Sequence, residues 1–243
     1  MIEKILLNLL WILPFLTVLF SIPIKENSPK LKRFHLASAG VVLLSSIYLL
    51  IQVFQNTISN TSSQIQLLYE TKLNWLNAIS AKYFIGIDAL SSMMLVLAAI
   101  IIFTGILATW RLEKGQKVFL GFFQILAASV YGVFISFDLV LFFVFYEMEA
   151  LCMYLLIAGY GSGNKDYGAK KLTLTLAIGS SMILAVFLGI YAETGTWNLI
   201  ELSKIALPES FQYYAFPILF LGFAVSSSLF PFHFWSPAGH SAA

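Results

Sequence analysis

The chain has 243 residues, of which 59% are hydrophobic and only 11% charged, and its mean hydropathy is +0.86. This composition excludes an ordinary soluble domain and is typical of an integral membrane protein. One cysteine, Cys152, excludes an intrachain disulfide, and three scattered histidines are too few for a zinc cage. The net charge of +2 comes without a basic patch interleaved with aromatic residues, so the sequence predicts no nucleic-acid partner.

Seven apolar stretches are long enough to cross a bilayer, whose hydrocarbon core needs about 20 helical residues. They cover residues 5–24, 36–58, 89–110, 118–137, 139–160, 172–191 and 213–230. Asp138 divides a run that is too long for one crossing, so we predict a tight helical hairpin around it. The sequence therefore predicts an all-α polytopic protein in the lipid bilayer, with loops at 59–88 and 192–212 that can carry short interfacial helices.

Basic residues lie mainly in alternate loops, a distribution that predicts orientation because short basic loops stay on the inner side. Three such loops contain Lys25, Lys30, Lys32 and Arg33; then Arg111, Lys114 and Lys117; then Lys165, Lys170 and Lys171. We therefore predict that the N-terminus lies outside and that the seventh span brings the chain inside. The alternative for residues 1–24 is a cleaved signal peptide, but the basic residues follow the apolar run and no A-x-A site is found.

Two ionisable residues lie near the middle of the fifth predicted span, Glu147 and Glu149. A charged side chain at this depth costs about 2.5–3.5 kcal/mol, so it normally faces a bundle interior, water or a partner. The two residues differ by about 200° around a helix and cannot share one site. A buried glutamate can relay protons where water reaches it; the alternative is a protonated side chain that hydrogen-bonds a neighbouring helix.

The seventh span combines polar residues with helix breakers. Hydroxyl groups at Ser226 and its two neighbours can line a hydrated path, although they are also common in packed membrane helices. Pro217 and Pro231 each remove a backbone hydrogen bond, so this span should be kinked or interrupted. His233 follows the break and can titrate near neutrality; the alternative is a hydrogen-bonded structural histidine.

Several short segments together resemble the antiporter-like subunits of the proton-pumping NADH-quinone oxidoreductase, of the chain M (mitochondrial chain 4) type. They are Tyr146-Glu147, Met153-Tyr154-Leu155-Leu156-Ile157, Phe223-Ala224-Val225, Pro231-Phe232-His233-Phe234-Trp235-Ser236-Pro237 and Gly239-His240, supported by Gly86-Ile87-Asp88-Ala89-Leu90 and Thr194-Gly195-Thr196-Trp197-Asn198-Leu199. The resemblance covers nearly the whole chain in order, although related antiporter chains share several of these segments.

The resemblance implies a 14-helix subunit with two inverted repeats, of which this chain corresponds to the first half. It implies N-terminal helices at residues 1–117 and an incomplete first repeat at residues 118–243. In this family a glutamate on helix five, here Glu147, pairs with a lysine on a broken helix seven. That lysine position is Ser226 in this chain, and no lysine occurs from residue 213 to residue 243. The usual ion pair is therefore missing, and Glu149 is an additional carboxylate on a different face.

The sequence thus predicts a multi-pass protein of the inner (plasma) membrane that moves protons through Glu147, Glu149, Ser226 and His233. The resemblance implies that the chain binds no cofactor or metal, and that NADH, flavin, iron-sulfur clusters and quinone belong to partner subunits. Expected partners are other membrane subunits, including related antiporter-like chains. The missing second half leaves two interpretations open: a fragment or split subunit whose other half is a separate polypeptide, or a truncated gene product. Two alternatives stay open: a subunit of a multisubunit sodium/proton antiporter, and an assembly remnant without transport.

Overall fold

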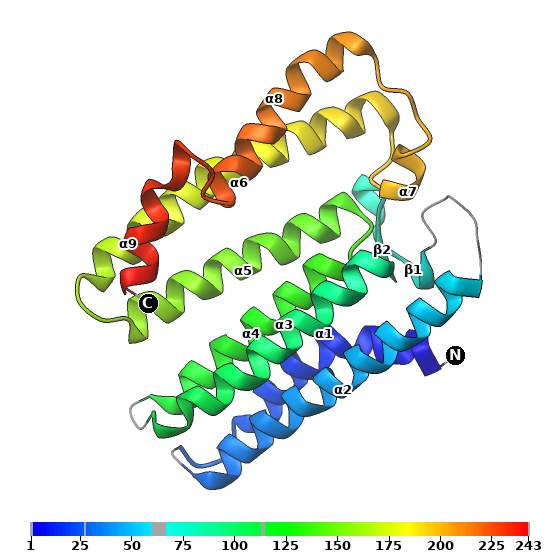
Figure 1. Cartoon of the computed structure of the whole chain (residues 1–243). Coiled ribbons are helices and arrows are strands. Elements are labelled where there is room, and N and C mark those ends of the chain that lie inside the picture. Colours follow the sequence, from blue (N-terminus) through cyan, green and yellow to red (C-terminus); the bar gives the residue numbers. More distant parts are fainter. Residues whose placement is uncertain (1, 27, 60–66, 113–114, 243) are drawn as a thin grey trace. The chain divides into compact units, whose positions relative to one another are not determined.

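The computed structural model describes residues 2–26, 28–59, 67–112 and 115–242, most of which are helical (Figure 1). The described chain divides into two compact units. The first contains Met1–Leu73 and Phe84–Ser136, and the second contains Asn74–Tyr83 and Phe137–Ala243. The predicted repeat boundary between residues 117 and 118 stays a prediction, because spatial compactness does not test an internal repeat.

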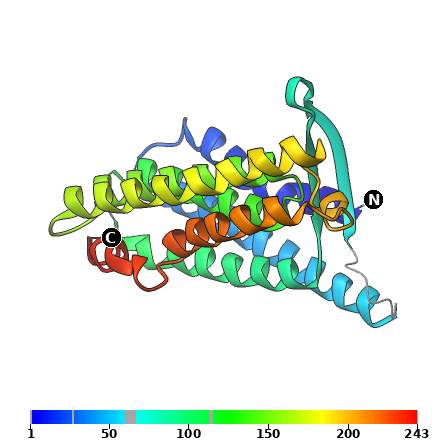
Figure 2. The same ribbon diagram turned by 90° about the horizontal axis from the view of Figure 1, so that it is seen from above.

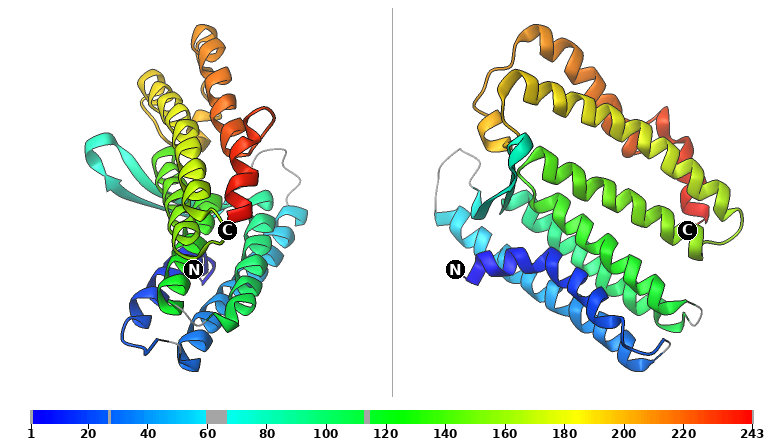
Figure 3. Two further views of the ribbon diagram at one scale, coloured as in Figure 1. Left: turned by 90° about the vertical axis from the view of Figure 1, so that its left-hand side faces the viewer. Right: turned by 180° about the vertical axis from the view of Figure 1, so that it is seen from behind.

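Four long helices form the first unit. They are α1 (Ile2–Ser21), α2 (Pro29–Ser59), α3 (Ala89–Ala108) and α4 (Gln116–Ile135). Helix α2 packs on α1 and α3, and α4 also packs on both of these helices, so the four run side by side (Figures 1 and 3). Each is long and apolar enough to cross a membrane. A short 3₁₀ helix, η2 (Thr109–Arg111), follows α3.

Polar side chains inside the first unit are buried between its helices. The Thr17 hydroxyl on α1 donates to the Ser38 hydroxyl on α2 over 2.6 Å. The Gln124 amide on α4 donates to the backbone carbonyl of His35 on α2 over 3.2 Å. His35 itself is fully buried, and neither ring nitrogen has a hydrogen-bond partner in the described part of the chain. These residues join α1, α2 and α4, but none of them is a carboxylate.

A β-hairpin occupies part of the segment predicted as a loop at 59–88, and it is the one departure from an all-helical chain among the described elements. Strand β1 (Leu68–Leu76) pairs with β2 (Ala81–Ile87) through a 3₁₀ turn, η1 (Asn77–Ile79), and Ser80 adopts a positive φ of 58° at the end of that turn. The alternation of polar and apolar residues in β1 is weak, so the sequence did not predict this strand. Residues 60–66 of the predicted loop lie outside the described residues.

The second unit contains α5 (Leu139–Tyr160), α6 (Lys165–Thr194), the short α7 (Leu199–Leu202), α8 (Glu209–Ser226), the 3₁₀ helix η3 (Phe232–Phe234) and α9 (Trp235–Ala242). Helix α6 packs against α5, α8 and α9. Figure 2 shows α6 and α8 side by side, with α9 beside the first half of α6. Helix α7 is a short helix in the predicted loop at 192–212.

Asp138 is the N-cap of α5, at the break that the sequence predicted between two membrane helices. Its carboxylate is buried and accepts hydrogen bonds from the backbone N–H groups of Val140, Leu141 and Lys82. A carboxylate that caps a helix N-terminus satisfies donors that have no partner within the helix. The predicted break at Asp138 is therefore confirmed, and the charge lies at the end of the helix instead of within it.

The seventh predicted span needs a correction of its bounds. It corresponds to α8, which begins at Glu209 instead of residue 213 and ends at Ser226 instead of residue 230. Six other described helices are long and apolar enough to cross a membrane, whereas α8 is only 18 residues long and begins with polar residues. The predicted interruption of this span is confirmed, but the helix already ends at the serine triplet, before Pro231.

Candidate proton-transfer site

The side of α5 that faces α6 is apolar. Its residues pack on two clusters around α6, and they are Leu139, Phe142, Phe143, Tyr146, Ala150, Met153, Tyr154 and Ile157. From the helical repeat of about 100° per residue, Glu147 and Glu149 each lie roughly 80° from the centre of this stripe, on opposite flanks. The two carboxyl groups therefore belong to different environments.

Glu147 is half-buried, and its Oε1 atom is buried without a hydrogen-bond partner among the described residues. An unsatisfied buried polar atom costs about 1–3 kcal/mol, and more where it carries charge. A bound proton, an internal water or a partner side chain would reduce this cost. Glu147 is thus the residue of α5 whose buried carboxyl oxygen still needs a partner.

A hydrogen bond beside Glu147 joins two helices that are far apart in the sequence. The Tyr146 hydroxyl donates to the Ser226 hydroxyl at the end of α8 over 2.5 Å, and Ser226 donates to the Gly222 carbonyl over 3.0 Å. Ser226 therefore lies next to the glutamate-bearing turn of α5. At the position where the resemblance implies a lysine, the chain has a neutral hydroxyl pair in place of a cation.

Close packing of α6 and α8 brings Ser226 to this position. A Cβ atom at Gly179 of α6 would lie 2.9 Å from the Gly222 carbonyl oxygen and 3.0 Å from the Ser226 hydroxyl. A Cβ atom at Gly222 would lie 2.8 Å from Ile183. Small residues at such crossings allow membrane helices to approach closely. The glycines thus allow α6 and α8 to approach closely beside Ser226.

The break after α8 is built from specific backbone contacts. Ser228 has a positive φ of 58°, and the N–H of Leu229 donates to the Ala224 carbonyl over 2.9 Å. The indole N–H of Trp235, at the start of α9, donates to the Val225 carbonyl over 2.8 Å. Carbonyl groups at a helix end need such partners in an apolar environment. The break is consequently an ordered part of the fold.

The other two predicted site residues do not join this cluster. Glu149 is half-buried on the opposite flank of α5. His233 is exposed on η3 and stacks on Phe230, with 5.7 Å between ring centroids. Within the described ranges, no hydrogen bond joins either residue to Tyr146, Glu147 or Ser226. Their roles in proton movement stay predictions.

Tyr146 is a site residue that the sequence analysis did not select. Its hydroxyl lies in an otherwise apolar stripe of α5, and a buried tyrosine hydroxyl normally requires a partner. That requirement was visible in the sequence, but the identity of the partner, 80 residues later, was not.

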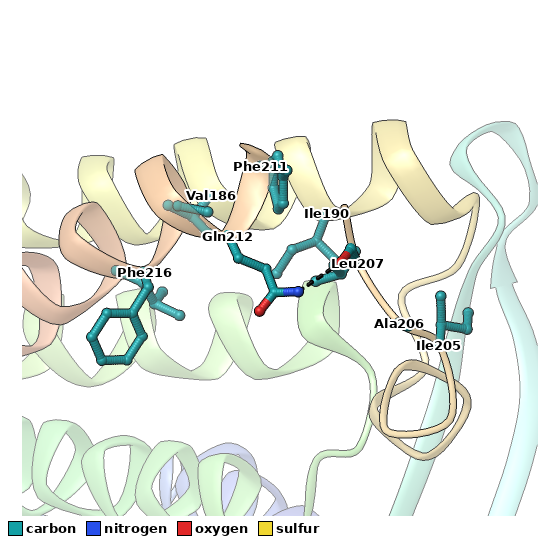
Figure 4. A pocket seen from close by; sticks show the side chains of 10 residues that line it. Val186, Ile190, Ile205, Ala206, Leu207, Phe211, Gln212 and Phe216 are labelled. Atoms are coloured by element: carbon teal, nitrogen blue, oxygen red, sulfur yellow. Dashed lines mark hydrogen bonds between the residues drawn. The ribbon is translucent and has the colours of Figure 1, made fainter. Parts of the chain in front are cut away.

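The second unit also contains an apolar cavity of about 300 Å³ between α6, α8 and the segment before α8 (Figure 4). Phe211, Phe216 and Ile190 are among its lining residues, and the Gln212 amide donates to the Leu207 carbonyl over 2.6 Å. No charged side chain is among the residues that line it. This cavity therefore offers no site for proton exchange. Across the described ranges, no group of three or more His, Cys, Asp or Glu side chains could hold a metal ion.

Comparison with known sequences finds a family match within the second unit. Residues 136–243 match the family described as NADH:quinone oxidoreductase/Mrp antiporter, transmembrane. The match contains the glutamate-bearing helix α5, the glycine contact and the broken helix, which are the parts that build the site.

Similar proteins extend the likeness to nearly the whole chain. It is 28% identical over 233 residues to NAD(P)H-quinone oxidoreductase chain 4-2 of Synechocystis, covering 95% of this chain and 41% of that protein. It is 27% identical over 248 residues to NADH-quinone oxidoreductase subunit M of Rickettsia typhi, covering 100% of this chain and 50% of that protein. The chain thus spans about half the length or less of these relatives.

Solved structures share the fold. A chain of respiratory complex I from Thermus thermophilus has a TM-score of 0.82 at 24% identity, covering 97% of this chain and 47% of that one. A chain of the Mrp complex from Dietzia has a TM-score of 0.79 at 19% identity, and the match covers 99% of this chain and 44% of that one. The predicted architecture, a helical membrane protein with the fold of half an antiporter-like subunit, is confirmed.

Proposed function

We propose that this chain is part of a proton-translocating membrane subunit of an NADH-quinone oxidoreductase. The observation that carries the proposal is the half-buried Glu147 beside the Tyr146–Ser226 hydrogen bond, within the segment that matches the family. The names of the relatives support the assignment to such a complex. Because the chain covers about half or less of their length, the activity belongs to the assembled protein.

In the proposed mechanism Glu147 takes up a proton from internal water and releases it after a change in its surroundings. The neutral Tyr146–Ser226 pair places no positive charge beside Glu147. The two hydroxyls can reorient and pass hydrogen bonds to water. Glu149, on the opposite flank of α5, and His233, on η3, would act in separate proton-transfer steps.

The proposal assigns the redox chemistry to partner subunits, with NADH, flavin, iron-sulfur clusters and quinone bound there. What this chain contributes is a protonatable path through the membrane. Its partners would be other membrane subunits of the complex, among them related antiporter-like chains.

A second candidate function is a subunit of a sodium/proton antiporter, because the matched family includes Mrp antiporters and the fold matches an Mrp chain. Membrane vesicles that contain the assembled complex would separate the two functions. We expect NADH oxidation to build a pH gradient of the same size across the vesicle membrane with and without sodium. Proton movement that requires sodium and persists without NADH would instead support the antiporter.

A further inference from the structure

An apolar groove lies between α1 and α2 in the first unit, outside the segment that matches the family. Its volume is about 400 Å³ and its lining is almost entirely apolar. Leu16, Phe20 and Phe34 line it and are exposed, so the groove opens away from the four-helix core. The only hydroxyls in its wall belong to Thr17 and Ser38, which hydrogen-bond each other. An occupant of this groove must be apolar along its length.

Basic residues precede the groove-lining stretch of α2 in the sequence. On α2, Phe34, Ala37 and Val41 line the groove at helical spacing; Lys30 lies on the same stripe one turn before Phe34, and Arg33 lies on its flank, next to Phe34. Both basic residues are exposed. At the matching end of α1, Phe20 lines the groove, and the α1–α2 connection follows it.

The positive charge at this end is in excess. The connection and the start of α2 carry Lys25, Lys30, Lys32 and Arg33, against a single acidic residue, Glu26. Lys32 is already engaged with the Trp110 carbonyl over 2.6 Å. In the part of the chain that the structure describes, Lys30 and Arg33 form no ion pair. An anion can therefore bind there without displacing an existing partner.

We propose that this groove binds an anionic phospholipid, with one acyl chain between α1 and α2 and the phosphate at Lys30 and Arg33. The apolar groove matches the chain, and the cationic rim matches the headgroup at the depth where a headgroup lies. Basic residues between transmembrane helices on the inner face of a membrane recognise anionic headgroups in this way. The predicted orientation puts this end of α2 on the inner face.

Photo-crosslinking in membranes tests the proposal without removing the chain from its complex. Membranes that contain the chain receive phosphatidylglycerol or phosphatidylcholine with a photoreactive acyl chain, and the labelled peptides are mapped by mass spectrometry. We expect phosphatidylglycerol to label the segments 9–20 and 34–41, and phosphatidylcholine to label them about tenfold less. Equal labelling by the two lipids, or labelling only elsewhere, would overturn the proposal.

Two variants separate the contributions of the headgroup and the acyl chain. Lys30→Gln with Arg33→Gln should reduce phosphatidylglycerol labelling about tenfold, whereas Lys165→Gln with Lys170→Gln, in another basic loop, should leave it unchanged. Ala37→Trp fills the groove and should also reduce labelling, whereas Ile101→Trp on the exposed side of α3 should not. Unchanged labelling in Lys30→Gln with Arg33→Gln would exclude the headgroup site, and unchanged labelling in Ala37→Trp would exclude the groove.

Discussion

The two units differ in where they hold ionisable groups and in the continuity of their helices. The first has four unbroken membrane helices, and its buried polar residues, such as Thr17 and Gln124, are neutral and bond to neighbouring helices. The second has two carboxyl groups near the middle of α5 and an interrupted helix beside one of them. The difference teaches that unbroken membrane helices can satisfy their buried polar groups with neutral partners, whereas the buried carboxyl oxygen of Glu147 lies beside an interrupted helix.

Orientation provides the sharpest test of both units together, because labelling is expected to be all or none. In a Cys152→Ser background, a cysteine at Lys204 should react with a membrane-impermeant reagent added outside intact cells. Cysteines at Lys32 in the first unit and Lys165 in the second should react only after the membrane is opened. Reaction of the Lys32 position from outside would reverse the orientation.

Within the second unit, adding a methyl group should lower stability more at the closely packed Gly179 than at Gly159, which has open space beside it. In Gly179→Ala the new Cβ atom meets the Gly222 backbone oxygen at 2.9 Å, so we expect a loss of about 1–3 kcal/mol in unfolding free energy. Gly159→Ala meets nothing within 4 Å and should be neutral or stabilising by up to about 1 kcal/mol. Thermal unfolding in mild detergent measures both; equal effects would refute the close contact.

Each unit has an aspartate that caps the N-terminus of a helix. Replacing each aspartate by alanine compares how much the two caps contribute to the free energy of unfolding. Asp88→Ala at α3 should cost about 1 kcal/mol. Asp138→Ala at α5 should cost about 1–2 kcal/mol, because the backbone N–H of Lys82 also loses its acceptor. Unfolding midpoints of the two variants give the comparison, and a smaller loss for Asp138→Ala would contradict it.

Asp138 also predicts a pH dependence. Burial raises the pKa of its carboxyl group above the usual value, although hydrogen bonds from Lys82, Leu141 and Val140 oppose the rise. The folded state therefore binds the proton more tightly than the unfolded state, and the resulting stability is fully present below about pH 3.8 and lost as pH rises through the folded pKa. Asp138→Asn should flatten the dependence of the unfolding midpoint on pH in this range; an unchanged slope would contradict the assignment.

The smallest effect is expected from the hydroxyl pair. Tyr146→Phe and Ser226→Ala should each cost about 1 kcal/mol, and the double variant should cost less than their sum because they share one hydrogen bond. Thr17→Val with Ser38→Ala gives the matched pair in the first unit. Additive losses for Tyr146 and Ser226 would show that the hydroxyls do not interact.

Much of the fold followed from length and hydropathy, because a membrane helix must satisfy its own backbone and show a long apolar run. The span from 139 to 160 was predicted with its observed bounds, and Asp138 marked the break before it. The β-hairpin at Leu68–Ile87 was not predicted, because its strands are short and partly polar. The end of α8 was displaced because the serine triplet, and not Pro231, stops the helix.

The site was predictable only in part. Ionisable residues are rare within apolar membrane spans, so Glu147 and Glu149 could be selected from the sequence alone. The partner of Tyr146 could not be found, because a hydrogen bond across 80 residues depends on how α6 and α8 pack. The exposed position of His233 likewise depends on the turn that follows the break.

Proton movement in glutamate variants of the assembled complex tests the central claim most directly. Glutamine matches the shape of a protonated glutamate but cannot exchange a proton, so Glu147→Gln should assemble normally and abolish proton movement through this chain. Glu149→Gln, on the opposite flank of α5, should retain most of it. Both are measured as the pH gradient per NADH oxidised in membrane vesicles. Normal pumping by Glu147→Gln together with loss in Glu149→Gln would contradict the account and assign the relay to the other carboxyl group.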